Sequence, residues 1–472
     1  MKIGRTGYGL RYAVKKSGSA VAWAALSIRC GTRDEGSFRS GTAHFCEHTL
    51  FKGTLRRSAS SINNRLDRLG GELNAFTTKE EIVIHATVLK EDLPKAVSLL
   101  LELATQATFP EKEVEREKGV VIEEINSYKD TPADDIYDRF EELLFAGHPL
   151  GRSILGTAAS VRRITAEELR AFARGGFTPD RMALTVVAGL DEDRLEAQLR
   201  RLAEPFFAAS APAAPAPASP VASSLASAAT PGSAATAPAS GLIAPASGPA
   251  VAPGLVAPAG CLGAPGLAAS ASGPGLVAHA LRGPYFAGHV FEKTVDKRNH
   301  ELNAVFGATA PSLYEERERI ATVLLANLLA GPGSNSVLNR ELREKRGWVY
   351  GVEASYTQFR DSGVLAVSLG CDRDNFAACE KVILRQFALL RERPLTPAVL
   401  HAAKKQLIGQ LSIGAEGGET QCLSMGKSLL AFGSISSDQE DRAKVEAVTA
   451  DDLQAAARRI LSPDSLSKLI FL

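Results

Sequence analysis

The segment from His44 to His48 carries the residues of this sequence whose types and spacing are best suited to chemistry. On a helix, His44 and His48 lie one turn apart on the same face, where two imidazoles can bind one zinc ion. Glu47 lies on the same side, so its carboxylate can reach a water molecule on that ion. The order H-x-x-E-H is the inverted zincin motif. The alternative is a surface helix with two solvated histidines.

A second acidic segment could complete such a site, because a catalytic zinc ion commonly has three protein ligands. Residues 110–128 predict a helix that begins with proline and acidic residues. Glu117 and Glu124 lie two turns apart on this helix and face the same way, so one could bind the metal and the other could orient a ligand. Glu115 and Glu123 fit a solvated acidic face better. The apolar positions of the helix are Val114, Val121 and Ile125.

Taken together, these residues resemble the pitrilysin family of metallopeptidases, and most closely its branch of mitochondrial processing peptidases and their bacterial relatives. The resemblance rests on residues 43–54, on the block 70–77 and on the second-flank segment 342–350. It covers both ends of the chain but not its middle. The family's third zinc ligand falls on Glu124, and its supporting glutamate falls on Glu117.

The resemblance implies a zinc site and a mechanism. It implies one Zn²⁺ per chain, held by His44, His48 and Glu124, with Glu47 as the general base and Glu117 as the support of a ligand. The cysteine inside the motif stands where the family commonly has leucine. Because it points away from the histidine face, we expect a buried thiol rather than a fourth ligand.

The resemblance also implies how a peptide is held. Arg343 and Tyr350 on the second flank would contact the substrate backbone and the developing oxyanion. Asn74, Ala75 and Phe76 would form an exposed strand edge to which an extended peptide adds. Related chains enclose substrates in a chamber and pair as homodimers or with a sister subunit, so that one chain's active flank faces its partner's second flank.

The elements that position these residues fall into two flanks. No Asp, Glu, Lys or Arg occurs between Glu204 and Arg282, and the stretch consists largely of Ala, Pro, Ser and Gly. This composition predicts a flexible linker over residues 205–281 rather than a folded third domain. The flanks are then a catalytic zinc-binding domain at 1–204 and a homologous domain without metal at 282–472.

The two flanks are copies of one unit. Thr165 with Glu168 predicts a capped helix start near the end of the first flank, and Thr449 with Asp452 predicts the same in the second. A Pro-Asp pair and a strand follow each helix at the same offset. The second copy has no H-x-x-E-H motif, and its residues opposite Glu124 and Glu117 are Gln410 and Ala403. It is therefore expected to serve as a substrate platform.

Strands in each flank come in pairs and do not alternate strictly with helices. This order favours an α+β fold of two homologous α/β sandwich domains over a doubly wound parallel sheet. Each sandwich is expected to have a mostly antiparallel sheet with helices packed on it. The expected strands are 21–28, 81–89, 183–188, 351–356, 364–369 and 466–472, and the expected helices include 93–106, 110–128, 315–329 and 397–411.

Charge and composition exclude several functions for this chain. The 472 residues carry 54 basic and 53 acidic side chains, a net charge of +1, with no basic stripe that would attract nucleic acid. We find no apolar run that could span a membrane and no signal segment, so we expect a cytoplasmic protein. The 6 scattered cysteines indicate reduced thiols rather than a disulfide framework.

The sequence therefore predicts a metalloendopeptidase, a zinc hydrolase that cleaves peptides or unfolded segments. Two alternatives remain. One is a catalytically silent partner or structural subunit of the same fold, which would lack one or more of the residues His44, Glu47, His48 and Glu124; none of them is missing here. The other is a peptide-binding protein in which zinc is only structural.

Overall fold

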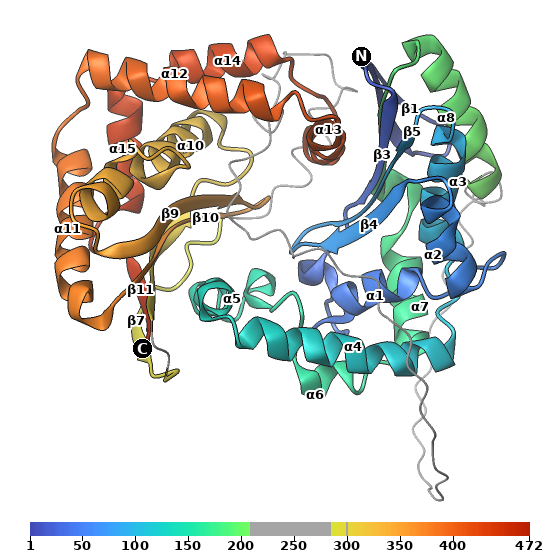
Figure 1. Cartoon of the computed structure of the whole chain (residues 1–472), viewed down its shortest axis with the longest axis horizontal. Helices are drawn as coiled ribbons and strands as arrows, with labels where there is room; N and C mark the ends of the chain where they lie inside the picture. The colour runs from blue at the N-terminus through green and yellow to red at the C-terminus, as the bar shows by residue number, and fades with distance from the viewer. Residues whose placement is uncertain (208–284, 299–300) are drawn as a thin grey trace, which may run out of the picture.

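The computed structural model describes residues 1–207, 285–298 and 301–472. The first part of the chain and the last part each build a sheet covered by helices, and the two units lie side by side (Figure 1). None of the described helices is both long enough and apolar enough to cross a membrane.

The first half contains one sheet and the helices that cover it. Its strands are β1 (Lys2–Arg5), β2 (Arg11–Lys16), β3 (Val21–Ile28), β4 (Glu72–Thr77), β5 (Ile82–Leu89) and β6 (Met182–Ala188). Its α-helices are α1 (Thr42–Leu50), α2 (Ala59–Asp67), α3 (Leu93–Gln106), α4 (Glu111–Lys129), α5 (Pro132–Leu144), α6 (Ala158–Val161), α7 (Ala166–Gly176) and α8 (Glu192–Phe207). Short 3-10 turns are η1 (Thr32–Asp34), η2 (Pro149–Gly151) and η3 (Pro179–Arg181).

The second half repeats this plan. Its strands are β7 (Glu292–Val295), β8 (Leu302–Ala310), β9 (Val349–Gln358), β10 (Gly363–Cys371) and β11 (Ser467–Phe471). Its helices are α10 (Glu316–Ala330), the π-helical turn η5 (Asn339–Glu344), α11 (Arg373–Glu392), α12 (Pro397–Gly414), α13 (Gly418–Phe432), α14 (Asp438–Ala447) and α15 (Ala450–Ile460).

The two sheets have the same topology. The first has the order β1-β2-β6-β3-β5-β4, and the second has the order β7-β11-β8-β10-β9. Apart from β1, each strand of the first sheet has a counterpart in the second. Each sheet contains one parallel pair, β2 with β6 in the first and β7 with β11 in the second. The other neighbouring strands are antiparallel. The predicted α+β fold with two duplicated, mostly antiparallel sheets is therefore confirmed.

The two predicted helix caps form in the structure. At the start of α7, Thr165 Oγ1 accepts a hydrogen bond from Glu168 N at 3.2 Å, and the Glu168 carboxylate accepts one from Thr165 N at 2.9 Å. At the start of α15, Thr449 and Asp452 repeat the exchange at 3.1 and 2.9 Å. Each box satisfies two backbone donors that a helix start otherwise leaves free.

The first half extends beyond its predicted end. Helix α8 runs to Phe207, past Glu204 and past Pro205, because Leu199, Ala203 and Phe207 continue its buried apolar face at helical spacing. The rest of the predicted linker, residues 208–281, lies outside the described residues.

In each half, one helix packs against the sheet of the other half. Residues Ile136, Phe140 and Leu144 of α5, from the first half, are buried against Val305 and Phe471 of the second sheet. In return, Cys422, Met425 and Leu429 of α13 are buried against Ala25 and Val83 of the first sheet. Figure 1 shows α5 beneath the second sheet and α13 between the two halves. Since burying each large apolar side chain contributes about 1.5–3 kcal/mol, this exchange ties the halves together.

The described cysteines are buried free thiols, in agreement with the absence of a disulfide framework. Cys46 is fully buried in the core of the first half, as expected for the cysteine inside the histidine motif. The full set is Cys30, Cys46, Cys371, Cys379 and Cys422. Cys261 lies outside the described residues.

The exchange of α13 predicts a difference between two helical glycines. A Cβ atom on Gly426 would lie 2.3 Å from Ser27 Oγ and 3.2 Å from Ser27 Cβ on the first sheet, whereas a Cβ atom on Gly409 of α12 has nothing within 4 Å. Gly426→Ala should therefore lower the free energy of unfolding by about 1–3 kcal/mol. Gly409→Ala, the matched control, should raise it by up to about 1 kcal/mol. Equal shifts of both variants in denaturant unfolding would contradict the close packing of α13.

Candidate active site

Helix α1, which carries the two histidines, is held at its start by a buried carboxylate. Glu35 is fully buried and accepts a hydrogen bond from Ala43 N at 3.1 Å, next to an ion pair with Arg152 at 3.4 Å. Burial raises the pKa of Glu35 to about 7. Gly41 precedes the helix at φ 89°, and a Cβ atom there would lie 2.6 Å from Leu155 O, so only glycine fits.

His44, His48 and Glu124 converge, although α1 and α4 are far apart in the sequence. Their candidate ligand atoms all lie within 4.8 Å of one another. Glu124 Oε2 is 3.1 Å from His48 Nε2 and 3.7 Å from His44 Nε2. His44 is 6% exposed, while the Glu124 side chain is 38% exposed, so the cluster is buried on one side and open on the other.

This donor set fits a divalent metal ion. Two ligand atoms on one tetrahedral zinc ion are about 3.4 Å apart, and the two distances from Glu124 Oε2 bracket this value. Glu124 Oε2 is also buried without a hydrogen-bond donor of good geometry. Such an oxygen is costly unless a cation or donor satisfies it.

The two histidines differ in basicity. Burial and the neighbouring charge of His48 together lower the pKa of His44 to about 4, although the charge of Glu124 acts in the opposite direction. Burial also disfavours the charged form of His48, but the carboxylates of Glu117 and Glu124 outweigh it and raise its pKa to about 10. Without a metal ion, His48 is thus the protonated member of the pair at pH 7.

Glu47 lies beside the cluster and is held by the edge strand of the first sheet. Its Oε2 accepts a hydrogen bond from Thr77 Oγ1 at 3.1 Å, from the end of β4. The side chain is buried, and this burial raises the pKa of Glu47. A raised pKa makes this carboxylate a stronger base, which suits proton transfer beside a metal position.

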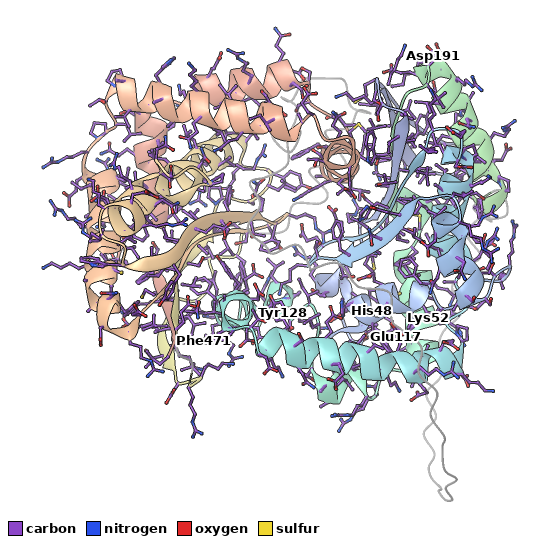
Figure 2. All side chains as sticks on the ribbon, in the orientation of Figure 1. His48, Lys52, Glu117, Tyr128, Asp191 and Phe471 are labelled. Carbon is purple, nitrogen blue, oxygen red and sulfur yellow. The ribbon has the colours of Figure 1, made fainter. Side chains whose placement is uncertain are left out.

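Glu117 supports His48 rather than joining the three ligands. Its Oε1 contacts His48 Nδ1 at 3.2 Å, and its Oε2 forms an ion pair with Lys52 Nζ at 2.7 Å. Burial alone would raise the pKa of Glu117, but His48 and Lys52 hold it below its usual value. Figure 2 shows His48, Lys52 and Glu117 together where α1 lies along α4. The contact fixes the ring so that Nε2 faces the cluster.

The buried and exposed faces of helix α4 are those that its sequence predicts. The predicted apolar positions Val114, Val121 and Ile125 are buried, and Glu115 and Glu123 are exposed.

The predicted substrate strand is the outer strand of the first sheet. Asn74, Ala75 and Phe76 belong to β4, which pairs with β5 and is the last strand of the sheet. Asn74 and Phe76 point to the exposed face and Ala75 to the half-buried face. The free edge of β4 begins next to Thr77 and therefore leads directly to Glu47.

Arg343 and Tyr350 lie in the second half. Arg343 is exposed in η5, and Tyr350, 62% exposed at the start of β9, donates a hydrogen bond to Asp372 Oδ1 at 2.7 Å. Within the described part of the chain, no hydrogen bond or ion pair joins either residue to the three candidate ligands.

The second half has no equivalent metal cluster among the described residues. Helix α12 stands where α4 stands in the first half, and it carries Ala403 and Gln410 at the positions of the two glutamates. Helix α10 follows β8 as α1 follows β3, and it is lined by the fully buried Leu324, Leu325 and Leu329.

Three supporting residues were not assigned a role from the sequence: Glu35, Lys52 and Thr77. Lys52 follows His48 by one helical turn, so spacing alone could have indicated a contact with the same acidic helix. Glu35 and Thr77 are brought in by tertiary folding, and neither has a local pattern that marks it.

Comparisons with known proteins now define the family. Residues 11–158 match the family described as Insulinase (Peptidase family M16), and residues 276–407 match the description Peptidase M16 inactive domain. Relatives described as uncharacterized zinc proteases occur in Mycobacterium bovis, with 31% identity over 94% of this chain and 86% of the relative, and in Streptomyces coelicolor, with 29% identity over 91% and 80%. One from Bacillus subtilis shows 26% identity over 94% and 91%.

Solved structures show the same fold. A protease from Helicobacter pylori matches with a TM-score of 0.78 and 18% identity, covering 100% of this chain and 99% of that one. A Pseudomonas fluorescens structure titled peptidase M16 inactive domain matches with a TM-score of 0.73 and 18% identity, covering 100% and 97%. The fold is thus that of these M16 structures, and in this chain it carries the H-x-x-E-H helix α1. The chain belongs to the insulinase, or pitrilysin, family of peptidases.

The contrast between the histidines predicts proton release on metal binding. Because a metal ion binds neutral imidazole, Zn²⁺ binding at pH 7 should displace about one proton, from His48, while His44 is already neutral. Glu117→Gln should lower the pKa of His48 and reduce this number. The exposed Glu115→Gln on the same helix should not. Titration calorimetry in buffers of different ionisation enthalpy measures the protons. Zinc binding without proton release would contradict the assignment of His48 as the protonated histidine.

Proposed function

We propose that this chain is a zinc-dependent endopeptidase that hydrolyses peptides or unfolded segments bound as an extended strand. The observation that carries the proposal is the convergence of His44, His48 and Glu124, with Glu47 held beside them. The peptidase family and the relatives described as zinc proteases support it.

His44, His48 and Glu124 would hold one zinc ion per chain. When bound, this ion supplies a Lewis acid that polarises the scissile carbonyl and lowers the pKa of water toward about 7. Glu117 keeps the His48 ring in its orientation through the contact with Nδ1. Lys52, paired with Glu117, keeps that carboxylate ionised.

Glu47 is the general base in this mechanism. Its carboxylate takes a proton from the attacking water and later delivers it to the departing amine nitrogen. Two features suit it to both steps. Burial raises its pKa, which makes it a stronger base, and the hydrogen bond from Thr77 limits its rotation.

The substrate would add to the free edge of β4. Backbone groups of Asn74, Ala75 and Phe76 would pair with an extended peptide, which gives affinity with few demands on its side chains. The peptide would then pass Thr77 toward Glu47. This arrangement suits unfolded segments, because a folded protein does not offer a free strand of that length.

Arg343 and Tyr350 would complete the site from a partner. Both are exposed on the second half, and among the described residues neither forms a hydrogen bond or ion pair with the candidate ligands of its own chain. In a homodimer or with a sister subunit, one chain's active half would face the partner's second half. Their donors would bind the substrate backbone and the developing oxyanion inside the resulting chamber.

The alternative of a silent subunit has less support. A subunit that only binds or scaffolds does not need a buried base at the metal position, yet Glu47 and Glu124 are both present and both placed at the cluster.

Glu47→Gln separates metal binding from catalysis. The variant keeps the volume and the acceptor for Thr77 but cannot take a proton, so turnover of a quenched peptide should fall by about 10²–10⁴-fold. Metal analysis should still give about one zinc per chain for the variant and the parent. Retained turnover would reject Glu47 as the base, and two zinc ions per chain would contradict the absence of a second site.

A mixing experiment tests the partner's role. Glu47→Gln removes the base, and the double substitution Arg343→Ala with Tyr350→Phe removes the platform, so each chain alone should be inactive. If the partner supplies Arg343 and Tyr350, hybrid dimers regain one complete site, and mixing the two inactive chains should restore a measurable share of parental activity. Mixing that restores nothing, while hybrid dimers form, would place all these residues in a single-chain site.

A further inference from the structure

Four charged side chains form a compact cluster where the two halves meet: Arg33, Glu80, Arg360 and Asp361, named here the charge clamp. Arg33 forms two hydrogen bonds with Asp361, at 3.0 and 2.6 Å, and a third with Glu80. Arg360 donates to the same oxygen of Glu80 from its Nε at 3.0 Å and from its backbone N at 3.3 Å. Arg33 and Glu80 belong to the first half, and the other two residues belong to the second.

The clamp is shielded from water and electrically balanced. Its side chains keep only 8% to 17% of their surface exposed, and it contains two positive and two negative groups. Salt therefore screens these pairs weakly. Removal of one partner leaves a buried charge without compensation, which costs far more than the loss of a surface ion pair.

Glu80 lies in the tight turn between β4 and β5, and the first half already braces this turn. Thr78 Oγ1 accepts hydrogen bonds from Glu80 N and Glu81 N at 3.2 and 2.9 Å. Arg33 N donates to Lys79 O at 2.9 Å. Gly31 packs so closely that a Cβ atom on it would lie 2.5 Å from the turn's backbone. The turn is thus a rigid unit, and whatever holds Glu80 holds all of it.

Both basic partners of Glu80 depend on the second half. Arg360 lies in the turn between β9 and β10, and the guanidinium of Arg33 is oriented by Asp361 from that same turn. The second half therefore adds its own hold on the β4–β5 turn to the contacts from the first half.

The turn begins immediately after Thr77, whose hydroxyl holds Glu47. As the outer strand of its sheet, β4 has β5 as its only strand partner among the described residues, so its end depends on the turn. Contacts then run without a break from Arg360 to Glu80, through the turn to Thr77, and from Thr77 Oγ1 to Glu47 Oε2 at 3.1 Å.

We propose that Arg360 and Glu80 are positioning residues: the second half orients the base Glu47 through the charge clamp and the β4–β5 turn. This inference rests on the proposed peptidase function, because it assigns the clamp a role in that reaction. The second half then acts on catalysis from within the same chain, independently of any contact with substrate.

Arg360→Met tests the clamp, because it keeps the aliphatic stem and the backbone N–H but removes every side-chain donor and the positive charge. We expect kcat for a quenched peptide to fall by on the order of tenfold to a hundredfold, with KM changed by less than about twofold and zinc content unchanged. Lys297→Met is the matched control, since it also breaks an ion pair between the halves, with Asp135 at 2.7 Å, but away from the turn. Its kcat should stay within about twofold of the parent. Unchanged kcat in a folded, zinc-replete Arg360→Met chain would overturn the proposal.

A double-variant cycle tests the route. Thr77→Val removes the hydroxyl that holds Glu47, so adding Arg360→Met to it should lower kcat little further. If the fold-decreases in kcat of the two single variants instead multiply in the double variant, the two residues act independently and the proposed route is wrong. If Arg360→Met does not fold, Glu80→Gln, which keeps an acceptor for Arg360, takes its place in the same cycle.

Hydrogen exchange supplies a readout that does not need activity. Arg360→Met should speed the exchange of the Glu80 and Glu81 amides, which the turn protects, and Lys297→Met should not. Unchanged exchange would overturn the proposal. If the parent chain cleaves no peptide, the proposed function fails, and this exchange measurement alone decides whether the clamp holds the turn.

Discussion

The site depends on the convergence of one carboxylate and two imidazoles from distant parts of the chain. Glu124 Oε2 lies 3.1 Å from the His48 ring and 3.7 Å from the His44 ring. A carboxylate in such surroundings needs a positive charge beside it, which protonated His48 supplies without a metal ion and a bound divalent ion would supply in its place. The surrounding structure serves this arrangement: Glu35 fixes the start of α1, and Glu117 fixes the ring of His48.

The two halves behave as one unit, because each completes the other. Helix α13 covers the first sheet, and α5, which directly follows the helix of Glu124, covers the second. The charge clamp adds an electrostatic link at the turn beside Thr77. A shift of the second half would therefore reach the site along two routes, through the end of α4 and through the end of β4.

Duplication supplied two scaffolds, of which one carries the candidate metal site. Strand order and helix caps are the same in both copies, while the metal positions differ. Gln410 and Ala403 replace the two glutamates of α4, and buried leucines line α10. Without carboxylates and imidazoles to satisfy, the second copy is free to serve as a covering surface. The family's own description of this region as an inactive domain agrees with that division.

Local pattern was enough for the α+β class, the duplicated sheets, the capped helices and the helix faces that carry His44, His48 and Glu124, because helical and strand spacing are properties of neighbouring residues. It could not reveal the exchange of α5 and α13 or the partners of Glu47 and Glu80. Those contacts join residues far apart in the chain, and a local pattern does not specify which distant residue a side chain will meet. Tertiary packing decides them, because apolar side chains from both halves fill the shared cores and the shielded charges of the clamp pair with one another.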